Sequence, residues 1–172
     1  VYPILRDKYQ LDFIQIGVIT LTFQIAGSLL QPVVGAVTDR RPFPYSTVIG
    51  MLFTLSGLIG LAFAPTYNLI LVSAASIGIG SSIFHPEATR MARYASGGRQ
   101  GLAQGILQVG GQAGGAMGPL FAALITVQRG QQSLAWFGVL AVIAVGLMIW
   151  TARRHDVIKT RFIESAQVKS KN

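Results

Sequence analysis

The most constraining feature of the sequence is a stretch of 27 residues without a charge, Gly101 to Val127, which contains seven glycines and one proline. As a helix it is long enough to cross a hydrocarbon layer about 30 Å thick. One face of that helix is apolar (Leu102, Ile106, Val109, Ala113, Met117, Leu120, Leu124) and the other carries glutamines and small residues (Gln104, Gln108, Gln112, Gly111, Gly115, Gly118, Pro119). We expect the second face to pack closely against other helices, as small residues allow in membranes. The alternative is that it lines a polar cavity, because three glutamines in lipid cost more than packing requires.

The composition points to the same environment. Only 12% of the residues are charged, against roughly 25% in ordinary soluble domains. The net charge of +8 comes from short basic clusters between apolar runs, which is typical of membrane-protein loops and not of a nucleic-acid surface. The chain has no cysteine and two histidines, so we expect no metal site, no cofactor and no enzymatic activity. The glycine-rich stretch lacks the preceding strand and the ending of a phosphate-binding loop.

Apolar runs divide the chain into five predicted membrane spans, at 13–37, 46–64, 69–88, 101–127 and 134–152. The sequence therefore predicts an all-α, polytopic membrane helix bundle over residues 1–152, followed by a polar tail at 153–172. The chain begins with Val1 and shows no signal-peptide pattern. We expect it to be an interior piece of a longer protein, with at least one further span upstream.

The basic residues divide unequally between the two sides that alternating spans define. Eleven lie in the segments 39–45, 90–100 and 153–172, and three lie in the segments on the other side. Positively charged loops stay in the cytoplasm. The sequence therefore predicts that the loops 39–45 and 90–100 and the tail 153–172 are cytoplasmic, in a multi-pass protein of the inner membrane.

Two charged clusters at the predicted cytoplasmic ends are candidate functional sites. Gly35, Asp39 and Arg40 lie at the end of the first span, where Asp39 could act as the latch of a gate; the alternative is a stop signal of solvated charges. His85, Glu87 and Arg90 end the third span, around Pro86.

The spacing of Arg90 three residues after Glu87 predicts an ion pair. This cluster could be a boundary ion pair beside a proline kink. It could also carry a proton, since histidine titrates near neutrality.

Two further sets of residues are candidates for substrate binding and helix packing. Four glutamines within the spans predict a polar inner face that lines a substrate cavity: Gln24, Gln31, Gln108 and Gln112. Gly114, Gly118 and Pro119 form a small-residue pattern with a proline, which is typical of a tightly packed helix that can bend.

These motifs together resemble the major facilitator superfamily. The loop Gly35-xxx-Asp39-Arg40 resembles its signature between helices two and three, and Gly114-xxx-Gly118-Pro119-xx-Ala122-Ala123 resembles its antiporter motif in helix five. More narrowly, the segments 21–40, 81–119 and 134–137 are similar to the fosmidomycin-resistance efflux proteins. The resemblance implies that the five spans are helices two to six of twelve. The helix-four arginine of many proton-coupled members would fall at Ala74 and is absent, which leaves Glu87, assisted by His85, as the proton carrier.

The resemblance implies a secondary transporter of alternating-access type, driven by protons, that exports a small drug such as fosmidomycin across the bilayer. Its first helix and its C-terminal half would complete the transporter, and the tail would link the two halves. One alternative is an uptake carrier of the same fold for a sugar or an organic anion. Another is a membrane scaffold without transport, against which the polar glutamine face argues.

Overall fold

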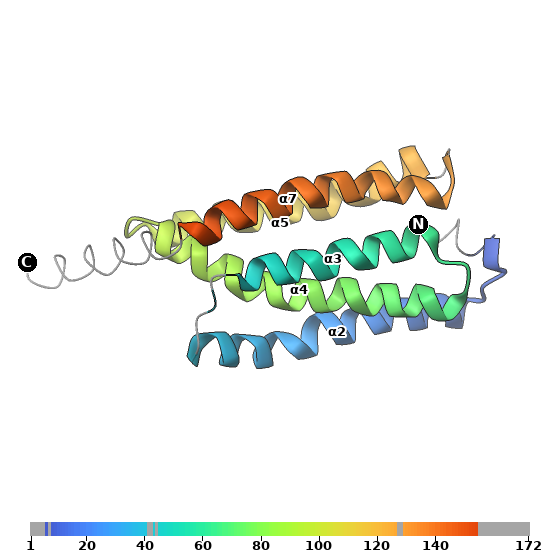
Figure 1. Ribbon diagram of the computed structural model, residues 1–172, viewed down its shortest axis with the longest axis horizontal. Helices are drawn as coiled ribbons and strands as arrows, with labels where there is room; N and C mark the ends of the chain where they lie inside the picture. The colour runs from blue at the N-terminus through green and yellow to red at the C-terminus, as the bar shows by residue number, and fades with distance from the viewer. Residues whose placement is uncertain (1–5, 7, 41–42, 44, 127–128, 155–172) are drawn as a thin grey trace, which may run out of the picture.

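The computed structural model describes residues 6, 8–40, 43, 45–126 and 129–154, without the side chains of Asp39, Ala122 and Thr126. Its long helices are α2 (Phe13–Arg40), α3 (Ser46–Phe63), α4 (Tyr67–Ala95), α5 (Gln100–Phe121) and α7 (Ala135–Arg153). A π-helical turn, η1 (Ala122–Thr126), follows α5, and a 3-10 turn, η2 (Gln131–Leu134), precedes α7. Figure 1 shows these helices running side by side along the long axis of the molecule. No strand occurs in the described ranges, which confirms the predicted all-α class.

Four stretches of the described helices are long and apolar enough to cross a membrane: Phe13–Thr38, Ser46–Phe63, Tyr67–Ala95 and Gln131–Arg153. The fifth long helix, α5, has 22 residues and no charge. At about 33 Å it is long enough, but it is not among the four stretches with the hydropathy of a membrane span, because glutamines and glycines interrupt its apolar residues. A polytopic helix bundle is therefore observed, in which α5 is the long helix outside these four stretches.

Two helices extend beyond the ends of the predicted spans, 37 and 88, because charged residues end an apolar run but not the helix. The helix α2 continues to Arg40 and α4 to Ala95, and each also contains a proline, Pro32 or Pro86. Neighbouring helices and side chains supply the interactions that a proline removes from a membrane helix. What ends α4 is the connector after it, in which Gly97 and Gly98 have φ angles of 56° and 90°. Glycine adopts this left-handed conformation without a steric penalty.

The helix α4 is the centre of the bundle, because it packs against α2, α3 and α5, while α7 packs against α3. Two of its glycines allow this close approach. A Cβ atom added to Gly78 would lie 2.6 Å from the carbonyl oxygen of Phe23 on α2. A Cβ atom added to Gly80 would lie 2.5 Å from the carbonyl oxygen of Gly50 on α3. Both helices therefore touch α4 through backbone atoms.

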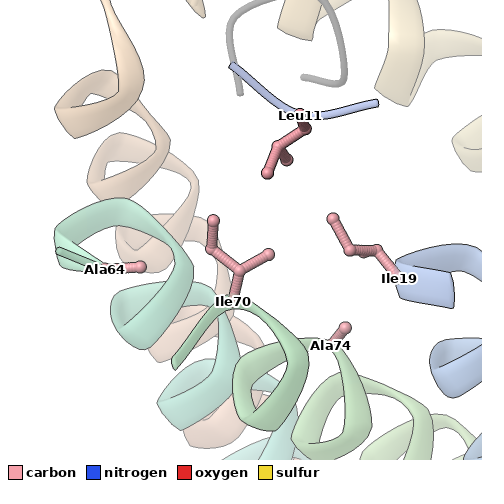
Figure 2. Close-up of a cluster of buried hydrophobic side chains, with 5 residues drawn as sticks. All are labelled: Leu11, Ile19, Ala64, Ile70 and Ala74. Carbon is pink, nitrogen blue, oxygen red and sulfur yellow. The ribbon is translucent and has the colours of Figure 1, made fainter. Parts of the chain in front are cut away.

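A cluster of buried apolar side chains joins α2, α3 and α4 at one end of the bundle, around the fully buried Ile70. Figure 2 shows its five members, from three segments of the chain: Leu11, Ile19, Ala64, Ile70 and Ala74. Between membrane helices, contacts of this kind stabilise the association by van der Waals packing.

The same end is also joined by one buried side chain, Gln131. Its Oε1 accepts hydrogen bonds from Lys8 Nζ at 2.8 Å and from the Tyr9 hydroxyl at 3.0 Å. Its Nε2 donates to the carbonyl oxygen of Leu61 at 2.6 Å. The single hydrogen of the Tyr9 hydroxyl is shared between Gln131 Oε1 and the carbonyl oxygen of Ala64, which both lie within reach. A single amide thus connects the segment before α2, the end of α3 and the turn before α7.

The expected close packing of the glycine-rich helix is wrong for the described residues. No residue of α5 is buried. A Cβ atom added to any of its seven glycines would find nothing within 4 Å. The helix touches α4 through side chains of its glutamine-bearing face, such as Gln104, which contacts Thr89, but no glycine of that face takes part in a close contact.

Candidate functional site

An open cleft of about 780 Å³ lies between the last third of α4 and the middle of α5. The helix α4 contributes Phe84, His85 and Thr89 to its lining, and α5 contributes Gln108 and Gln112. The two helices are tied beside it by a hydrogen bond of 3.1 Å from Gln104 Nε2 to the carbonyl oxygen of Thr89. The cleft therefore combines amide and imidazole groups with an aromatic ring, a lining that can hydrogen-bond a small polar molecule.

The side chain of His85 is exposed and held by its own helix. Its Nδ1 lies 3.0 Å from the carbonyl oxygen of Ser81 and 3.3 Å from the Ser81 hydroxyl. The ring of Phe84 meets it edge-on, with centroids 6.2 Å apart. These contacts fix the direction of the imidazole at the edge of the cleft.

A second cluster joins α4 to the end of α2. The Arg90 guanidinium lies 3.1 Å from the Glu87 carboxylate, as the spacing of three residues predicts. Its Nη1 donates to the carbonyl oxygen of Thr38 at 2.9 Å, and its Nη2 donates to the Thr38 hydroxyl oxygen at 3.0 Å. Glu87 is buried, with 5% of its surface exposed, so the ion pair is shielded from solvent and connects two helices.

The structure does not bring His85 and Glu87 together. Residues two apart on a helix point about 200° away from each other. Accordingly, Glu87 is buried beside the Arg90 contact with α2, while His85 is exposed at the cleft that α5 borders. The predicted relay thus separates into an ion pair on one side of α4 and an imidazole on another.

The predicted gate loop lies at the end of α2 that Arg90 contacts. Arg40 is the last residue of α2 and is exposed. The carbonyl oxygen of Gly35 accepts a hydrogen bond of 3.3 Å from the Thr38 hydroxyl. The side chain of Asp39 lies outside the described residues, as do residues 41, 42 and 44. The latch that was assigned to Asp39 therefore stays a prediction.

The four glutamines of the predicted substrate face do not share one site. Gln108 and Gln112 line the cleft. Gln24 is exposed and Gln31 is partly buried on α2, and neither is among the described residues that line the cleft. The substrate role of Gln24 and Gln31 therefore stays a prediction, since a glutamine in a span identifies a polar position but not the helix that it faces.

The small-residue motif lies on the open side of α5. No atom lies within 4 Å of a Cβ atom added to Gly114 or Gly118, so neither marks a helix contact here. Pro119 lies inside α5, two residues before its end at Phe121, and the π-helical turn η1 follows. Such turns accompany local changes of helix geometry, which agrees with a helix that can bend at this point.

Two residues that connect elements, Thr38 and Gln131, were not predicted from the sequence. Thr38 lies 52 positions from Arg90, its partner, and Gln131 lies 70 positions from Leu61. A weak signal existed for Thr38, since it adjoins the candidate Asp39. Gln131 had none, because a polar residue before a span is expected to be solvated.

The arrangement contains no group of three or more His, Asp or Glu side chains that could bind a metal within the described ranges. Instead it has a polar cleft in a bundle of membrane-length helices, with a buried ion pair next to a basic end. This combination defines a class, the integral membrane helix bundles with a polar cleft between their helices. The sequence model of the Major Facilitator Superfamily matches residues 1–170, and the chain belongs to that superfamily.

Several curated proteins of this superfamily are similar to the chain. The "Fosmidomycin resistance protein" of Escherichia coli strain K12 is 52% identical over 163 residues, which are 92% of this chain and 40% of that protein. The "Uncharacterized MFS-type transporter YfnC" of Bacillus subtilis strain 168 is 46% identical over 88% of the chain and 37% of its own length.

The "Nitrite extrusion protein" of the same Bacillus strain is 26% identical over 85% of the chain and 38% of that protein. The chain thus spans about 40% of the length of the curated relatives that it matches. No solved structure matched it significantly.

Proposed function

We propose that the intact protein is a secondary transporter that exports a small polar antibiotic such as fosmidomycin, driven by protons. The observation that carries this proposal is the 52% identity to a fosmidomycin resistance protein over 92% of the chain. The cleft between α4 and α5 supports it, because Gln108, Gln112 and His85 offer hydrogen-bonding groups between two long helices of the bundle. In alternating access, two bundles rock about such a central site, and this chain would form most of one bundle.

We assign proton coupling to Glu87. It is buried, it pairs with Arg90, and Arg90 also holds Thr38 at the end of α2. Protonation of Glu87 would remove the negative partner of Arg90 and weaken the connection between α4 and α2. A proton could thereby loosen the end of the bundle where Gly35, Asp39 and Arg40 form the proposed gate.

The proposed orientation places this end in the cytoplasm of a cell with an inner membrane. Figure 1 shows that α2, α4 and α7 end at the same end of the bundle. Their last turns carry Arg40, Arg93 and Arg153, as the positive-inside rule requires of a cytoplasmic side. Since the chain has no cysteine, a single cysteine at Ser96 can be labelled selectively. If an impermeant reagent labelled this cysteine from outside intact cells, the protein would have the opposite orientation.

The decisive experiment measures fosmidomycin transport by the intact protein in proteoliposomes under an imposed pH gradient. We expect the wild type to concentrate the drug against its gradient. We expect Glu87→Gln to abolish this uphill transport and to retain exchange at equilibrium, because the substrate cleft is unchanged. The matched control is Glu164→Gln, at the chain's only other glutamate.

Three outcomes of this assay contradict parts of the proposal. Uphill transport by Glu87→Gln equal to that of the wild type removes Glu87 from coupling and leaves a boundary ion pair. Drug accumulation in the direction of uptake favours the alternative carrier, for a sugar or an organic anion. The absence of any exchange, with fosmidomycin or with nitrite as the second probe, favours the scaffold.

A further inference from the structure

Among the described residues that line the cleft between α4 and α5, His85 is the one with a titratable side chain. The other polar residues of this lining are the neutral Thr89, Gln108 and Gln112. The charge that α4 and α5 contribute to the cleft therefore depends on one imidazole. A ligand meets from these two helices either a neutral lining or a lining with a single positive charge.

The contact with Ser81 decides which nitrogen of His85 serves the ligand. A carbonyl oxygen can only accept a hydrogen bond. The contact of 3.0 Å between Nδ1 and the carbonyl oxygen of Ser81 therefore requires that Nδ1 carries a hydrogen. In the neutral ring Nε2 is then an acceptor, and in the protonated ring it becomes a second donor. Protonation thus reverses the polarity that His85 presents to the cleft, without a movement of the ring.

The elements packed around α4 place few other charges near this imidazole. The helices α3 and α5 carry no titratable side chain, and α2 carries only Asp39 and Arg40, in its last turn. On α4 itself the charged residues are Glu87, Arg90 and Arg93, followed by Tyr94. The carboxylate of Glu87 is buried against Arg90 on another side of the helix. An anion in the cleft is therefore repelled by no carboxylate of its lining.

We propose that His85 is the specificity-determining residue of this cleft and that it binds anionic substrates in the protonated form. The charged ring donates Nε2–H to an anionic oxygen of the substrate, and the carboxamides of Gln108 and Gln112 donate to its other oxygens. The positive charge of the ring then offsets the negative charge of the bound anion, so that the loaded cleft is neutral. This proposal rests on the transport function proposed above, and the proton held on His85 is distinct from the proton that Glu87 is proposed to couple to transport.

The proposal predicts that anion binding takes up a proton. The test is calorimetric titration of the purified intact protein with fosmidomycin, a phosphonate, and with nitrite, each in two buffers of different ionisation enthalpy. The titration is run at pH values from about 6 to about 8, the range in which histidine side chains change charge, and the proton uptake is read at the upper end. We expect an uptake that approaches about one proton per bound anion.

Two matched variants assign the proton to its residue. His85→Gln keeps an amide donor but cannot take a proton, and we expect it to bind the anions about 10- to 100-fold more weakly and without proton uptake. His155→Gln, at the only other histidine of the chain, should bind and take up protons as the wild type does. Thermal unfolding of both variants shows whether a loss of anion binding comes from misfolding. In that case, His85→Asn serves as the second variant, with the same expectation.

Proton uptake by His85→Gln equal to that of the wild type overturns the proposal. So does binding in which the wild type takes up no proton, which indicates that the neutral Nε2 accepts a hydrogen bond from the ligand. Failure of the wild type to bind either anion also overturns it. The proposed function is tested separately: it fails if the proteoliposomes show no uphill transport. If the protein exported only neutral molecules, it would still be a transporter, but the inference about His85 would be wrong.

Discussion

The helices α4 and α5 both contain glycines, but the glycines have opposite surroundings. In α4, Gly78 and Gly80 lie against the backbone of α2 and α3, where an added Cβ atom would come within 2.6 Å of a carbonyl oxygen. In α5, seven glycines have nothing within 4 Å. The number of glycines therefore does not indicate a helix contact. What matters is whether the backbone of a neighbour lies opposite the residue.

The two helices also differ in their polar contacts: those of α4 join it to another helix, whereas most of those of α5 face an open cleft. The Glu87–Arg90 pair of α4 reaches Thr38 and joins a second helix at a buried position. The glutamines Gln108 and Gln112 of α5 line an open cleft, and its bond to α4 is the contact of Gln104 with Thr89. The helix α4 thus holds the bundle together, while α5 presents groups that a ligand can reach.

The largest expected effect on stability comes from removing the positive charge of Arg90, which pairs with the buried Glu87 near the end of α4. Arg90→Met leaves the buried Glu87 without its partner and Thr38 without its donor. Breaking a buried ion pair in this way destabilises proteins by about 3–5 kcal/mol. Thermal unfolding in detergent should show a large decrease in melting temperature.

The control for this change is Arg93→Met, one turn later and exposed, which should alter stability by less than about 0.5 kcal/mol. Equal effects of the two variants would show that Arg90 does not connect α4 to α2.

A smaller effect is expected from adding one methyl group at the contact of α3 and α4. In Gly80→Ala the new atom meets the carbonyl oxygen of Gly50 at 2.5 Å, and a backbone atom cannot rotate away. Overpacking of this kind costs about 1–3 kcal/mol. The matched variant is Gly105→Ala in α5, where the methyl group enters open space. The difference in melting temperature between the two variants measures the contrast between the helices directly.

The smallest effect, and one of opposite sign, is expected at the motif glycine of α5. Gly118→Ala should stabilise the helix by up to about 1 kcal/mol, because alanine has the higher helix propensity and no neighbour lies within 4 Å. Thermal unfolding and transport by the intact protein are the measurements. A loss of stability as large as that of Gly80→Ala would show that a part of the protein outside the described residues packs on this face.

Much of the fold could be predicted from the sequence because its signals are local. Uncharged apolar runs define the helices, and the spacing of Glu87 and Arg90 predicts their ion pair. The ends of α2 and α4 could not be predicted from the apolar runs, because both helices continue through charged residues beyond 37 and 88, and α4 ends only at the connector with Gly97 and Gly98.

The packing could not be predicted for a different reason. A pattern of small residues describes the surface of one helix, whereas a contact also requires the surface of its partner. The glycines of α5 therefore suggested a contact that the structure lacks, and Thr38 was missed although it holds Arg90. Likewise, Gln24 and Gln108 have the same chemistry, and only the position of α4 assigns the second to the cleft.

The low hydropathy of α5 has a consequence for how the protein is made. A segment enters the bilayer from the translocon according to its hydrophobicity, and the glutamines Gln104, Gln108 and Gln112 lower that of α5. Its connector to α4 is only the four residues 96–99, and Gln104 already has a partner on α4. We therefore expect α4 and α5 to insert as one helical hairpin. A glycosylation reporter should show efficient insertion of 67–126 and poor insertion of 100–126 alone, and equal insertion of both would mean that α5 needs no preceding helix.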